Sequence, residues 1–596
     1  MSPRAPLRPL ARILDARARG ENPDVIEAEN IRDRHEVMRD KSRARAESRL
    51  LLLVLGFCAA FLTIGIRMAA LAGAEPQEPR ATVAGSRIQA QRADIEDRNG
   101  NVLATNLVTH ALYSHPRDMV DPARTARELA RIFPDMDEEK LLRQFTGKSA
   151  FLWLRKTLSP EQVQAVHDIG EPGLLFGPRE MRLYPNGKLA AHVLGGSRFG
   201  EEGVHSAEVV GVAGVEKAMD DRLRDPGQLD KPLRLSLDLP VQAAIAEVLH
   251  SGMKLLNAKG AASILMDART GEVLAMVSLP DFDPNDRPLP PTQGDPADSP
   301  IFNRALQGVY ELGSVMKAFP VAQALELGLV NPQTIINTTS PMKLGRFTVR
   351  DFRNYGPANS VTDVMVKSSN IGTTRIIQQV GAVRQEAFLK EMGFLDPTNL
   401  ELIEAARARP LVPKRWSDVH SATVSYGHGL SASPMHLAAA YATLVNGGYR
   451  VQPTLIKQEG EVPRGAPVIS RRTSDQMREI LRQVVVRGSA KMTDVPGYFV
   501  GGKTGTADKQ KPTGGYYKDK VMANFAGAFP MNDPRYVIIV SLDEPVETSG
   551  TEARRTAGWT AVPVTAEIIR RIAPLLGLRP AEVAAHAPAK VTAVRN

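Results

Sequence analysis

The chain has 596 residues, which allows about four domains of ordinary size, and 43% hydrophobic residues are enough to bury their cores. Its formal net charge is +9, a small excess for this length, and aromatic residues make up only 5%. A nucleic-acid-binding protein needs a folded basic patch with interleaved aromatic residues, so this composition disfavours a nucleic-acid partner. The single cysteine, Cys58, excludes an intrachain disulfide and a CxxC metal site.

One segment has the composition of a membrane-spanning helix. Residues 50–71 carry no charge except for Arg67, and about 20 residues at 1.5 Å each cross a hydrocarbon core. No basic residue lies between Arg67 and Arg80. The stretch before the segment, in contrast, holds Arg39, Lys41, Arg43, Arg45 and Arg49. The positive-inside rule therefore predicts that residues 1–49 are cytoplasmic and that the chain beyond about residue 72 lies outside the cytoplasm, across the membrane.

A cleaved signal peptide is the alternative for this segment, because Ala72-Gly73-Ala74 resembles a cleavage site. The apolar run is longer than a usual signal-peptide core, and 49 residues precede it, which is long for the charged region of a signal peptide. We therefore favour an uncleaved anchor that contains Cys58, so that the exported part has no thiol.

Changes in composition and in the predicted secondary structure divide the chain into six parts. Residues 1–49 combine 12 Lys and Arg with nine Asp and Glu and are predicted to form a tail with one short helix. The other parts are the predicted membrane helix 50–71, a polar linker 72–87, a first domain 88–235, a second domain 236–575 and a loose tail 576–596.

In the first domain, short strands are predicted between helices such as Pro122–Phe133 and Pro160–His167. The second domain opens with an amphipathic helix entered at Asp238-Leu239-Pro240. Further strands are predicted at Ala261–Met266, Glu272–Ser278, Tyr498–Val500, Ala523–Phe529 and Arg535–Leu542, the first two as a hairpin. Strands at both ends of a domain, with helices between them, predict an α+β fold whose sheet is closed by its two termini.

The first candidate catalytic motif is Ser314-Val-Met-Lys317. A serine hydroxyl needs a base to become a good nucleophile, and on a helix positions i and i+3 share one face, so Lys317 can reach Ser314. Gly313 and a following apolar run predict that Ser314 opens a buried helix, where a free backbone N–H can face a developing oxyanion. The same S-x-x-K pattern recurs at Ser251 and Ser340, which we interpret as structural.

Two further motifs follow. Ser368-Ser369-Asn370 is an S-x-N, whose hydroxyl and amide suit a proton relay that also holds Lys317, although alone it is more typical of a turn or helix cap. Lys503-Thr504-Gly505-Thr506 places a lysine and two hydroxyls at a strand edge, which suits a substrate carboxylate, while the glycine permits close approach. In isolation this segment would more often be a loop than a site.

The order of the motifs is specific. S-x-x-K, S-x-N and K-T-G occur in that sequence, with 54 and 135 residues between their starts, as in β-lactamases and penicillin-binding proteins. Over residues 88–570 the chain resembles the class B penicillin-binding proteins, the membrane-anchored peptidoglycan D,D-transpeptidases. The segments that carry the resemblance include Arg92–Gly100, Arg182–Pro185, Gly211–Glu216, Tyr426–Pro434 and Ala440–Gly448. The stretch Lys503–Pro545 is most similar to the cell-division (septal) member.

The resemblance implies an elongated α+β pedestal of the dimerisation type, followed by a transpeptidase domain like that of the serine β-lactamases. In such a domain a five-stranded antiparallel sheet has helices on both sides. It implies that Ser314 is acylated by the D-Ala-D-Ala end of a stem pentapeptide, or by a β-lactam, with neutral Lys317 as base. Ser368 and Asn370 are then expected to relay the proton and to hold Lys317.

The resemblance further implies that Lys503, Thr504 and Thr506 bind the terminal carboxylate, and that the Thr506 N–H next to Gly505 joins the oxyanion site. No metal or organic cofactor is implied. The expected location is the bacterial inner membrane, with a single pass, a cytoplasmic N-terminus and a periplasmic catalytic domain at the septum. The expected partners are a division-specific membrane glycosyltransferase and other divisome proteins.

Two alternatives of other classes stay open at this point. One is a hydrolase with the same serine and lysine, either a β-lactamase or a D,D-carboxypeptidase. The other is a non-catalytic divisome scaffold or β-lactam sensor, in which the first domain carries the function.

Overall fold

The computed structural model describes the backbone of residues 8–73, 92–202 and 207–581. Side chains within these ranges are described except at residues 8–10, 40–51, 69–73, 201–202 and 207–208. Most of the predicted linker 72–87 and the tail beyond residue 581 therefore lie outside the described residues. The chain divides into two compact units, Met1–Gln89 and Ala90–Asn596.

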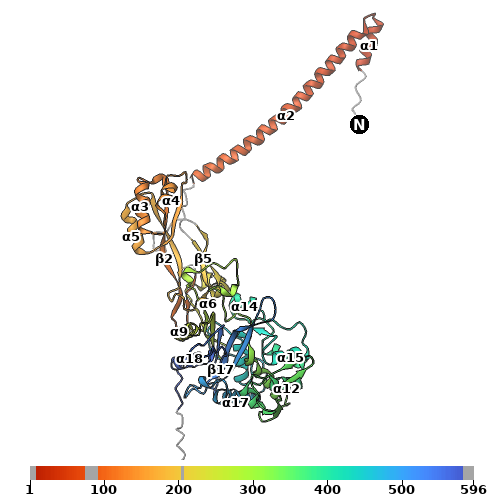
Figure 1. Cartoon of the computed structure of the whole chain (residues 1–596). Helices are drawn as coiled ribbons and strands as arrows, with labels where there is room; N and C mark the ends of the chain where they lie inside the picture. Colours follow the sequence, from red (N-terminus) through yellow and green to blue (C-terminus); the bar gives the residue numbers. More distant parts are fainter. Residues whose placement is uncertain (1–7, 74–91, 203–206, 582–596) are drawn as a thin grey trace, which may run out of the picture. The chain divides into compact units, whose positions relative to one another are not determined.

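The described part of the first unit is helical, with α1 at Arg8–Ala18 and α2 at Pro23–Gly73 (Figure 1). Asn22 Oδ1 accepts a hydrogen bond from the Asp24 amide at 3.1 Å, and Pro23 occupies the first turn, as is favourable at a helix start. The expectation of one short helix in residues 1–49 is wrong. Their Ala, Glu and Arg residues favour helix and run without a break into the apolar segment.

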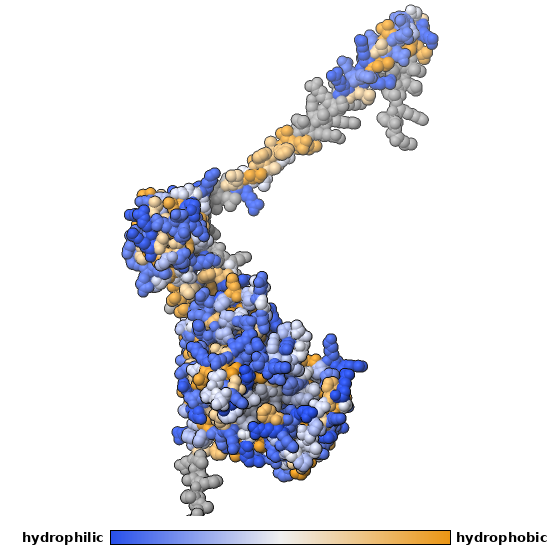
Figure 2. Space-filling model, viewed as in Figure 1, coloured by the Kyte–Doolittle hydropathy of each residue, from blue (hydrophilic) through white to orange (hydrophobic). Residues whose placement is uncertain are grey.

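Figure 2 shows a hydrophobic surface along part of α2, where Leu52, Phe57 and Phe61 are each more than 60% exposed. Within the part of the chain that the structure describes, no helix is sufficiently long and apolar to cross a membrane. The predicted span 50–71 lies only partly within the described side chains, because those of residues 50–51 and 69–71 fall outside them.

The second unit begins with the pedestal, an α+β region around a five-stranded sheet of order β3-β2-β1-β7, in which β4 also pairs with β2. The strands are β1 Ile95–Glu96, β2 Val102–Ser114, β3 Leu152–Leu158, β4 Leu174–Leu183 and β7 Leu233–Arg234. Helices α3 (Pro122–Ile132), α4 (Glu138–Phe145) and α5 (Pro160–Ile169) gather around β2 and enclose a small core of their own (Figure 1). The two helices predicted here are confirmed as α3 and α5.

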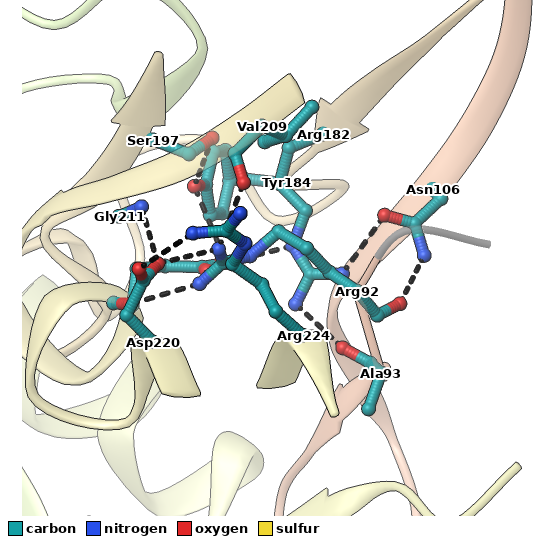
Figure 3. A network of polar contacts seen from close by, with 11 residues as sticks. Arg92, Ala93, Asn106, Arg182, Tyr184, Ser197, Val209, Gly211, Asp220 and Arg224 are labelled. Carbon is teal, nitrogen blue, oxygen red and sulfur yellow. Dashed lines mark hydrogen bonds and ion pairs between the residues drawn. The ribbon is translucent and has the colours of Figure 1, made fainter. Parts of the chain in front are cut away.

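The base of the pedestal is built on a buried ionic cluster (Figure 3). Arg92 contacts Glu216 at 2.7 Å and Asp220 at 2.6 Å, and Arg182 Nε donates to Glu216 Oε1 at 2.7 Å. The Tyr184 hydroxyl also donates to Glu216 Oε1, at 3.3 Å. Because the Arg92 and Glu216 side chains have no exposed surface, water does not stabilise their charges, and each charge is stabilised by its buried partners. Three of the segments that resemble class B proteins thus meet in one cluster.

Other elements of the base are the β5–β6 hairpin, Gly196–Glu202 and Ala207–Ala213, with α6 Ala191–Leu194, α7 Gly214–Ala218 and α8 Asp220–Arg224. A tight turn after β1 connects the base to the second domain. Its Asp97 Oδ2 accepts a hydrogen bond from the Leu239 amide at 3.0 Å, and the Arg98 amide donates to Leu237 O at 2.8 Å. The base and the second domain also share one continuous hydrophobic core.

The second domain is organised around a five-stranded sheet of order β16-β17-β18-β8-β9, antiparallel throughout. The strands are β8 Gly260–Asp267, β9 Val273–Leu279, β16 Gly501–Gln510, β17 Tyr516–Phe529 and β18 Tyr536–Asp543. Every residue of β9 and β18 is buried, so both faces of the sheet are covered. Helices α9 (Leu239–Leu255) and α18 (Ala561–Leu575) pack on each other and on the sheet, and α16 (Pro434–Val445) packs on β8, β17 and β18.

The remaining helices are α10 Ala318–Glu326, α11 Val361–Lys367, α12 Asn370–Val380, α13 Ala382–Glu391, α14 Ile403–Arg407, α15 Asp418–Ser425 and α17 Arg471–Arg487. The short strands are β10 Tyr310–Glu311, β11 Ile335–Asn337, β12 Met342–Leu344, β13 Phe347–Val349, β14 Ala358–Ser360 and β15 Ser431–Ala432. A 3₁₀ turn, η5, spans Gly313–Lys317.

The predicted α+β domain with a sheet closed by its termini is confirmed, because β18 from the C-terminal part pairs with β8 from the N-terminal part. The Asp238 side chain accepts from the Val241 amide at the start of α9, as its position predicts. The strand expected at Tyr498–Val500 is wrong, since β16 begins at Gly501. The Gly-Gly-Lys-Thr-Gly-Thr sequence at the start of β16 has low strand propensity, so the pattern did not indicate a strand there. The glycines of β16 allow close packing.

Removal of the Glu216 carboxylate is predicted to destabilise the pedestal strongly. Glu216→Ala should lower the free energy of unfolding by about 3–5 kcal/mol, because it leaves the buried Arg182 without its carboxylate and Arg92 with Asp220 alone. Glu247→Ala is the matched control, since Glu247 is 70% exposed in its pair with Arg571, and it should cost less than about 1 kcal/mol. Chemical denaturation of the full chain measures both, and equal effects would contradict this prediction.

Candidate active site

Ser314 and Lys317 both lie in η5, the 3₁₀ turn that precedes α10. In a 3₁₀ helix the side chains at i and i+3 eclipse, so the two residues project from the same face. The predicted helix start is therefore present, with 3₁₀ rather than α geometry in its first turn. Gly313 begins the turn at φ +64°, a conformation that favours glycine.

Three contacts from distant segments fix the backbone of η5. The Tyr441 hydroxyl of α16 donates to Val315 O at 2.8 Å, and Asn524 Nδ2 of β17 donates to Leu312 O at 3.2 Å. The Gly313 amide donates to Gly427 O at 3.1 Å. The position of Ser314 is thus determined by a helix, a strand and a loop that are far apart in the sequence.

The edge strand β16 lies directly against η5. A Cβ atom added to Gly505 would be 2.4 Å from Leu312 O, and one added to Gly313 would be 2.6 Å from Thr506 O. Only glycine fits at such distances. The predicted Lys503–Thr506 strand edge therefore lies beside the predicted nucleophile, with the Thr506 backbone adjacent to Gly313.

The two lysines of the motifs converge on Ser368. Lys317 Nζ donates to Ser368 O at 2.5 Å and to Ser368 Oγ at 3.1 Å. Lys503 Nζ donates to the same Oγ at 3.0 Å and to Thr504 O at 3.1 Å. Both lysine residues are fully buried, so one hydroxyl oxygen joins two amines out of contact with solvent.

Burial shifts both amines towards their neutral forms. It lowers the pKa of Lys317 well below its usual value, and the nearby Lys503 charge lowers this pKa further, against the opposing effect of Asp351. Burial also lowers the pKa of Lys503, to about 7. The arrangement therefore favours a free amine on Lys317, while Lys503 carries an ammonium group only below about pH 7.

Ser368 occupies an unusual backbone conformation at the end of α11, with φ +60° and ψ +45°. A non-glycine residue in this left-handed region costs about 1–2 kcal/mol, and such strain is concentrated at functional sites. Ser369 Oγ accepts from the Gly372 amide at 2.9 Å at the start of α12, so the middle of the S-x-N motif is also a helix cap.

Asn370 departs from its expected role. Its side-chain nitrogen donates to Arg350 O at 3.0 Å, and the hydrogen bonds of Lys317 go to Ser368. The main-chain N–H of Asn370 donates to Asp351 Oδ1, which also receives the hydrogen bond of the Ile371 amide. In this structure Ser368, and not Asn370, holds Lys317. Asn370 instead lines the cavity described next.

A cavity of about 650 Å³ opens at these motifs. It is lined by Ser314, Ser368, Asn370, Thr504 and Thr506, and further by Phe352, Arg353, Tyr355, Lys367, Ser489, Lys491, Met492, Thr556, Gly558 and Trp559. Arginine and lysine are the only charged residues of this lining, so the cavity favours an anionic ligand.

The other two S-x-x-K sequences lie elsewhere. Ser251 and Lys254 are exposed on α9, and Lys343 is exposed on β12 after Ser340. Neither serine lines this cavity.

Three supporting residues were not predicted from the sequence. Ser489 Oγ contacts Thr504 Oγ1 at 2.6 Å, while Asn524 and Tyr441 support η5. Asn524 and Tyr441 carry a weak signal, as polar groups inside otherwise apolar runs. Ser489 has no comparable signal, since a serine after a helix is common.

The chain matches two protein-family models, the penicillin binding protein transpeptidase domain over residues 261–569 and the penicillin-binding protein dimerisation domain over residues 87–227. It is 35% identical over 565 residues to the probable peptidoglycan D,D-transpeptidase FtsI of Caulobacter vibrioides, covering 91% of this chain and 92% of that protein. Identity to the probable peptidoglycan D,D-transpeptidase PenA of Neisseria gonorrhoeae is 32%, over 77% of this chain and 81% of that protein.

Among solved structures, penicillin-binding protein 3 of Mycobacterium tuberculosis with aztreonam is similar, with a TM-score of 0.62 and 26% identity over 83% of this chain and 98% of that chain. The fold and the motif order thus define a transpeptidase domain joined to a dimerisation-type pedestal. The chain belongs to the class B penicillin-binding proteins, and the resemblance seen in the sequence is confirmed.

Close packing at Gly505 is predicted to be essential for activity. Gly505→Ala places a Cβ 2.4 Å from Leu312 O and forces β16 away from η5, and a shift of about 1 Å at an active site can lower a rate about a hundredfold. The rate of covalent labelling by a fluorescent penicillin measures the effect. Gly227→Ala is the control, because its Cβ meets only the Asp225 side chain, at 3.4 Å. Wild-type labelling of Gly505→Ala would contradict the close approach.

Proposed function

We propose that the chain is a serine-type D-Ala-D-Ala transpeptidase that cross-links peptidoglycan stem peptides at the division septum. The observation that carries this proposal is the Lys317–Ser368–Lys503 cluster, in which two buried amines share the hydroxyl of Ser368, a residue that lines the same cavity as Ser314. The relatives named FtsI and PenA are described as peptidoglycan D,D-transpeptidases, which supports the same reaction here.

In the proposed acylation step, Ser314 Oγ attacks the carbonyl carbon between two D-alanines while its proton passes to the Lys317 amine. The tetrahedral intermediate then expels the terminal D-alanine, whose nitrogen receives a proton through the Ser368 hydroxyl. An ester remains on Ser314. The amine of a second stem peptide attacks this ester, so that an amide cross-link forms and the serine hydroxyl is restored.

Transition-state stabilisation comes from the backbone at the contact of η5 and β16. The N–H groups of Ser314 and Thr506 serve as the oxyanion donors, which the approach of Gly313 to Thr506 supports. Loss of one such donor typically costs about 100-fold to 1,000-fold in rate.

Substrate recognition uses the anion-favouring cavity. The hydroxyls of Thr504 and Thr506, which line the cavity, bind the terminal carboxylate together with the Lys503 ammonium, which is buried behind this lining. The Gly505 backbone packs on η5. Asn370, which lines the cavity, contacts the substrate backbone rather than Lys317. A β-lactam carries the same carboxylate next to a reactive carbonyl and acylates Ser314 in place of the donor stem.

The same proposal includes a location and partners. The exposed apolar side chains of α2 support a single-pass anchor in the bacterial inner membrane, with the basic stretch before it in the cytoplasm. The catalytic domain then faces the periplasm. The proposed role of the pedestal is to dock a division-specific membrane glycosyltransferase and other divisome proteins. The family model that matches this region is a dimerisation domain, which is compatible with a role in protein contacts.

Covalent labelling locates the nucleophile. Mass spectrometry of the penicillin-treated protein should find the acyl group on Ser314, and Ser314→Ala should abolish it. Ser251→Ala and Ser340→Ala are matched controls with the same S-x-x-K pattern and should keep full labelling. Loss of the label in either control would refute the choice of serine. Rapid release of the label by water would favour a hydrolase, and normal septa in cells that carry only Ser314→Ala would favour a scaffold.

The pKa shifts predict a bell-shaped pH profile for the second-order acylation constant. At low pH Lys317 becomes protonated and loses its function as a base, so the rate falls. Above the Lys503 pKa of about 7 the ammonium loses its charge and binds the carboxylate less well, so the rate falls again. A β-lactam whose carboxylate is esterified should lack the alkaline decline. A rate that rises steadily to pH 10 with the free carboxylate would contradict this assignment.

A further inference from the structure

Glu311, three residues before Ser314, is a buried carboxylate that none of the steps above uses. The residue is 5% exposed, and its Oε2 has no hydrogen-bond partner. Among the described residues no ion pair includes it, and a cation would be the usual compensation for a buried carboxylate. Such an uncompensated group needs an explanation beyond stability.

The other oxygen of Glu311 makes three hydrogen bonds. Glu311 Oε1 accepts from the Gly429 amide at 2.6 Å, from Gln510 Nε2 at 2.9 Å and from the Tyr516 hydroxyl at 3.1 Å. One acceptor atom therefore binds donors from three separate segments of the chain.

These segments are the ones that surround the nucleophile turn. Gln510 and Tyr516 face each other in register next to the turn that joins β16 to β17. Gly429 follows Gly427, whose carbonyl accepts the hydrogen bond of the Gly313 amide. Glu311 thus connects the C-terminal end of β16 to the segment that leads into η5. Gly505, five residues before Gln510 in the same strand, packs on η5.

We propose that Glu311 is a positioning residue, which sets the register of β16 against η5 and thereby the distance between the Thr506 N–H and the Ser314 hydroxyl. This inference rests on the proposed function, in which the Thr506 N–H is an oxyanion donor. Beyond its pairing with β17, β16 meets the segment around η5 at two places, the glycine contact at Gly505 and the Glu311 carboxylate at Gln510 and Tyr516. Without the carboxylate contact, the turn end of the β16–β17 hairpin can shift relative to η5.

A pair of variants tests this role. Glu311→Ala removes the acceptor and should lower the acylation rate constant at saturating β-lactam about tenfold to a hundredfold, as expected for a displaced donor. The half-saturating concentration should change little, because the carboxylate-binding residues remain. Glu311→Gln keeps an acceptor oxygen for all three donors and should retain most of the wild-type rate.

Two further variants remove the donors of the hairpin. Gln510→Ala and Tyr516→Phe should each slow acylation less than Glu311→Ala, and neither should add to the loss in a Glu311→Ala background. If Glu311→Ala does not fold, as judged by thermal unfolding, the Gln510→Ala/Tyr516→Phe double variant replaces it. This double variant should slow acylation, and the stability of its pedestal should equal that of the wild type.

Three results would overturn the inference. The first is a wild-type acylation rate in Glu311→Ala, or in the double variant where it replaces Glu311→Ala. The second is a raised half-saturating β-lactam concentration with an unchanged rate constant, and the third is a Glu311→Gln variant as slow as Glu311→Ala. Failure of the proposed function is distinguishable, because the wild-type protein would then carry no acyl group on Ser314.

Discussion

The site depends on one contact, in which the amines of Lys317 and Lys503 meet at the hydroxyl of Ser368 without access to water. Two ammonium groups this close and this deeply buried are unfavourable, because burial and mutual repulsion both disfavour the second charge. Burial therefore lowers the pKa of both lysines, and repulsion by Lys503 lowers the pKa of Lys317 further. In the proposed reaction the two amines have separate tasks, Lys317 as the base and Lys503 as the cation on β16.

Backbone packing converts this chemistry into a site. The strand that carries Lys503 has no strand partner on its outer edge within the described sheet, and there it packs on η5 through Gly505 and Gly313. Glycine is required at both positions because a Cβ would collide with a main-chain carbonyl. The left-handed Ser368 adds a local strain that the surrounding helices must support. The buried charges of the pedestal differ from the two lysines, because Arg92 and Glu216 have opposite charges and form an ion pair. This pair joins segments that are far apart in the sequence.

The sequence was sufficient to predict the closed α+β sheet, the β8–β9 hairpin and the proximity of the three motifs. Those features follow from local patterns and motif order, which a single chain displays. It was not sufficient for β16, whose glycine-rich sequence lacks strand propensity and is extended because it packs on both β17 and η5. It also gave no indication that the Asn370 amide turns to Arg350 O, because that contact depends on the path of a loop. Ser489, Tyr441 and Glu311 act through tertiary contacts, which no spacing along the chain reveals.

The most direct measurement is the titration of the individual lysine amines. In protein labelled with ¹³C at the lysine ε-carbon, the signal that disappears in Lys317→Arg reports Lys317, and the signal lost in Lys503→Arg reports Lys503. We expect the pKa of Lys317 to lie well below that of an exposed lysine and the pKa of Lys503 to lie near 7, while every exposed lysine is charged at pH 7. If both signals titrate near 10.5 like those of exposed lysines, no free amine is available beside Ser314 and the account is contradicted.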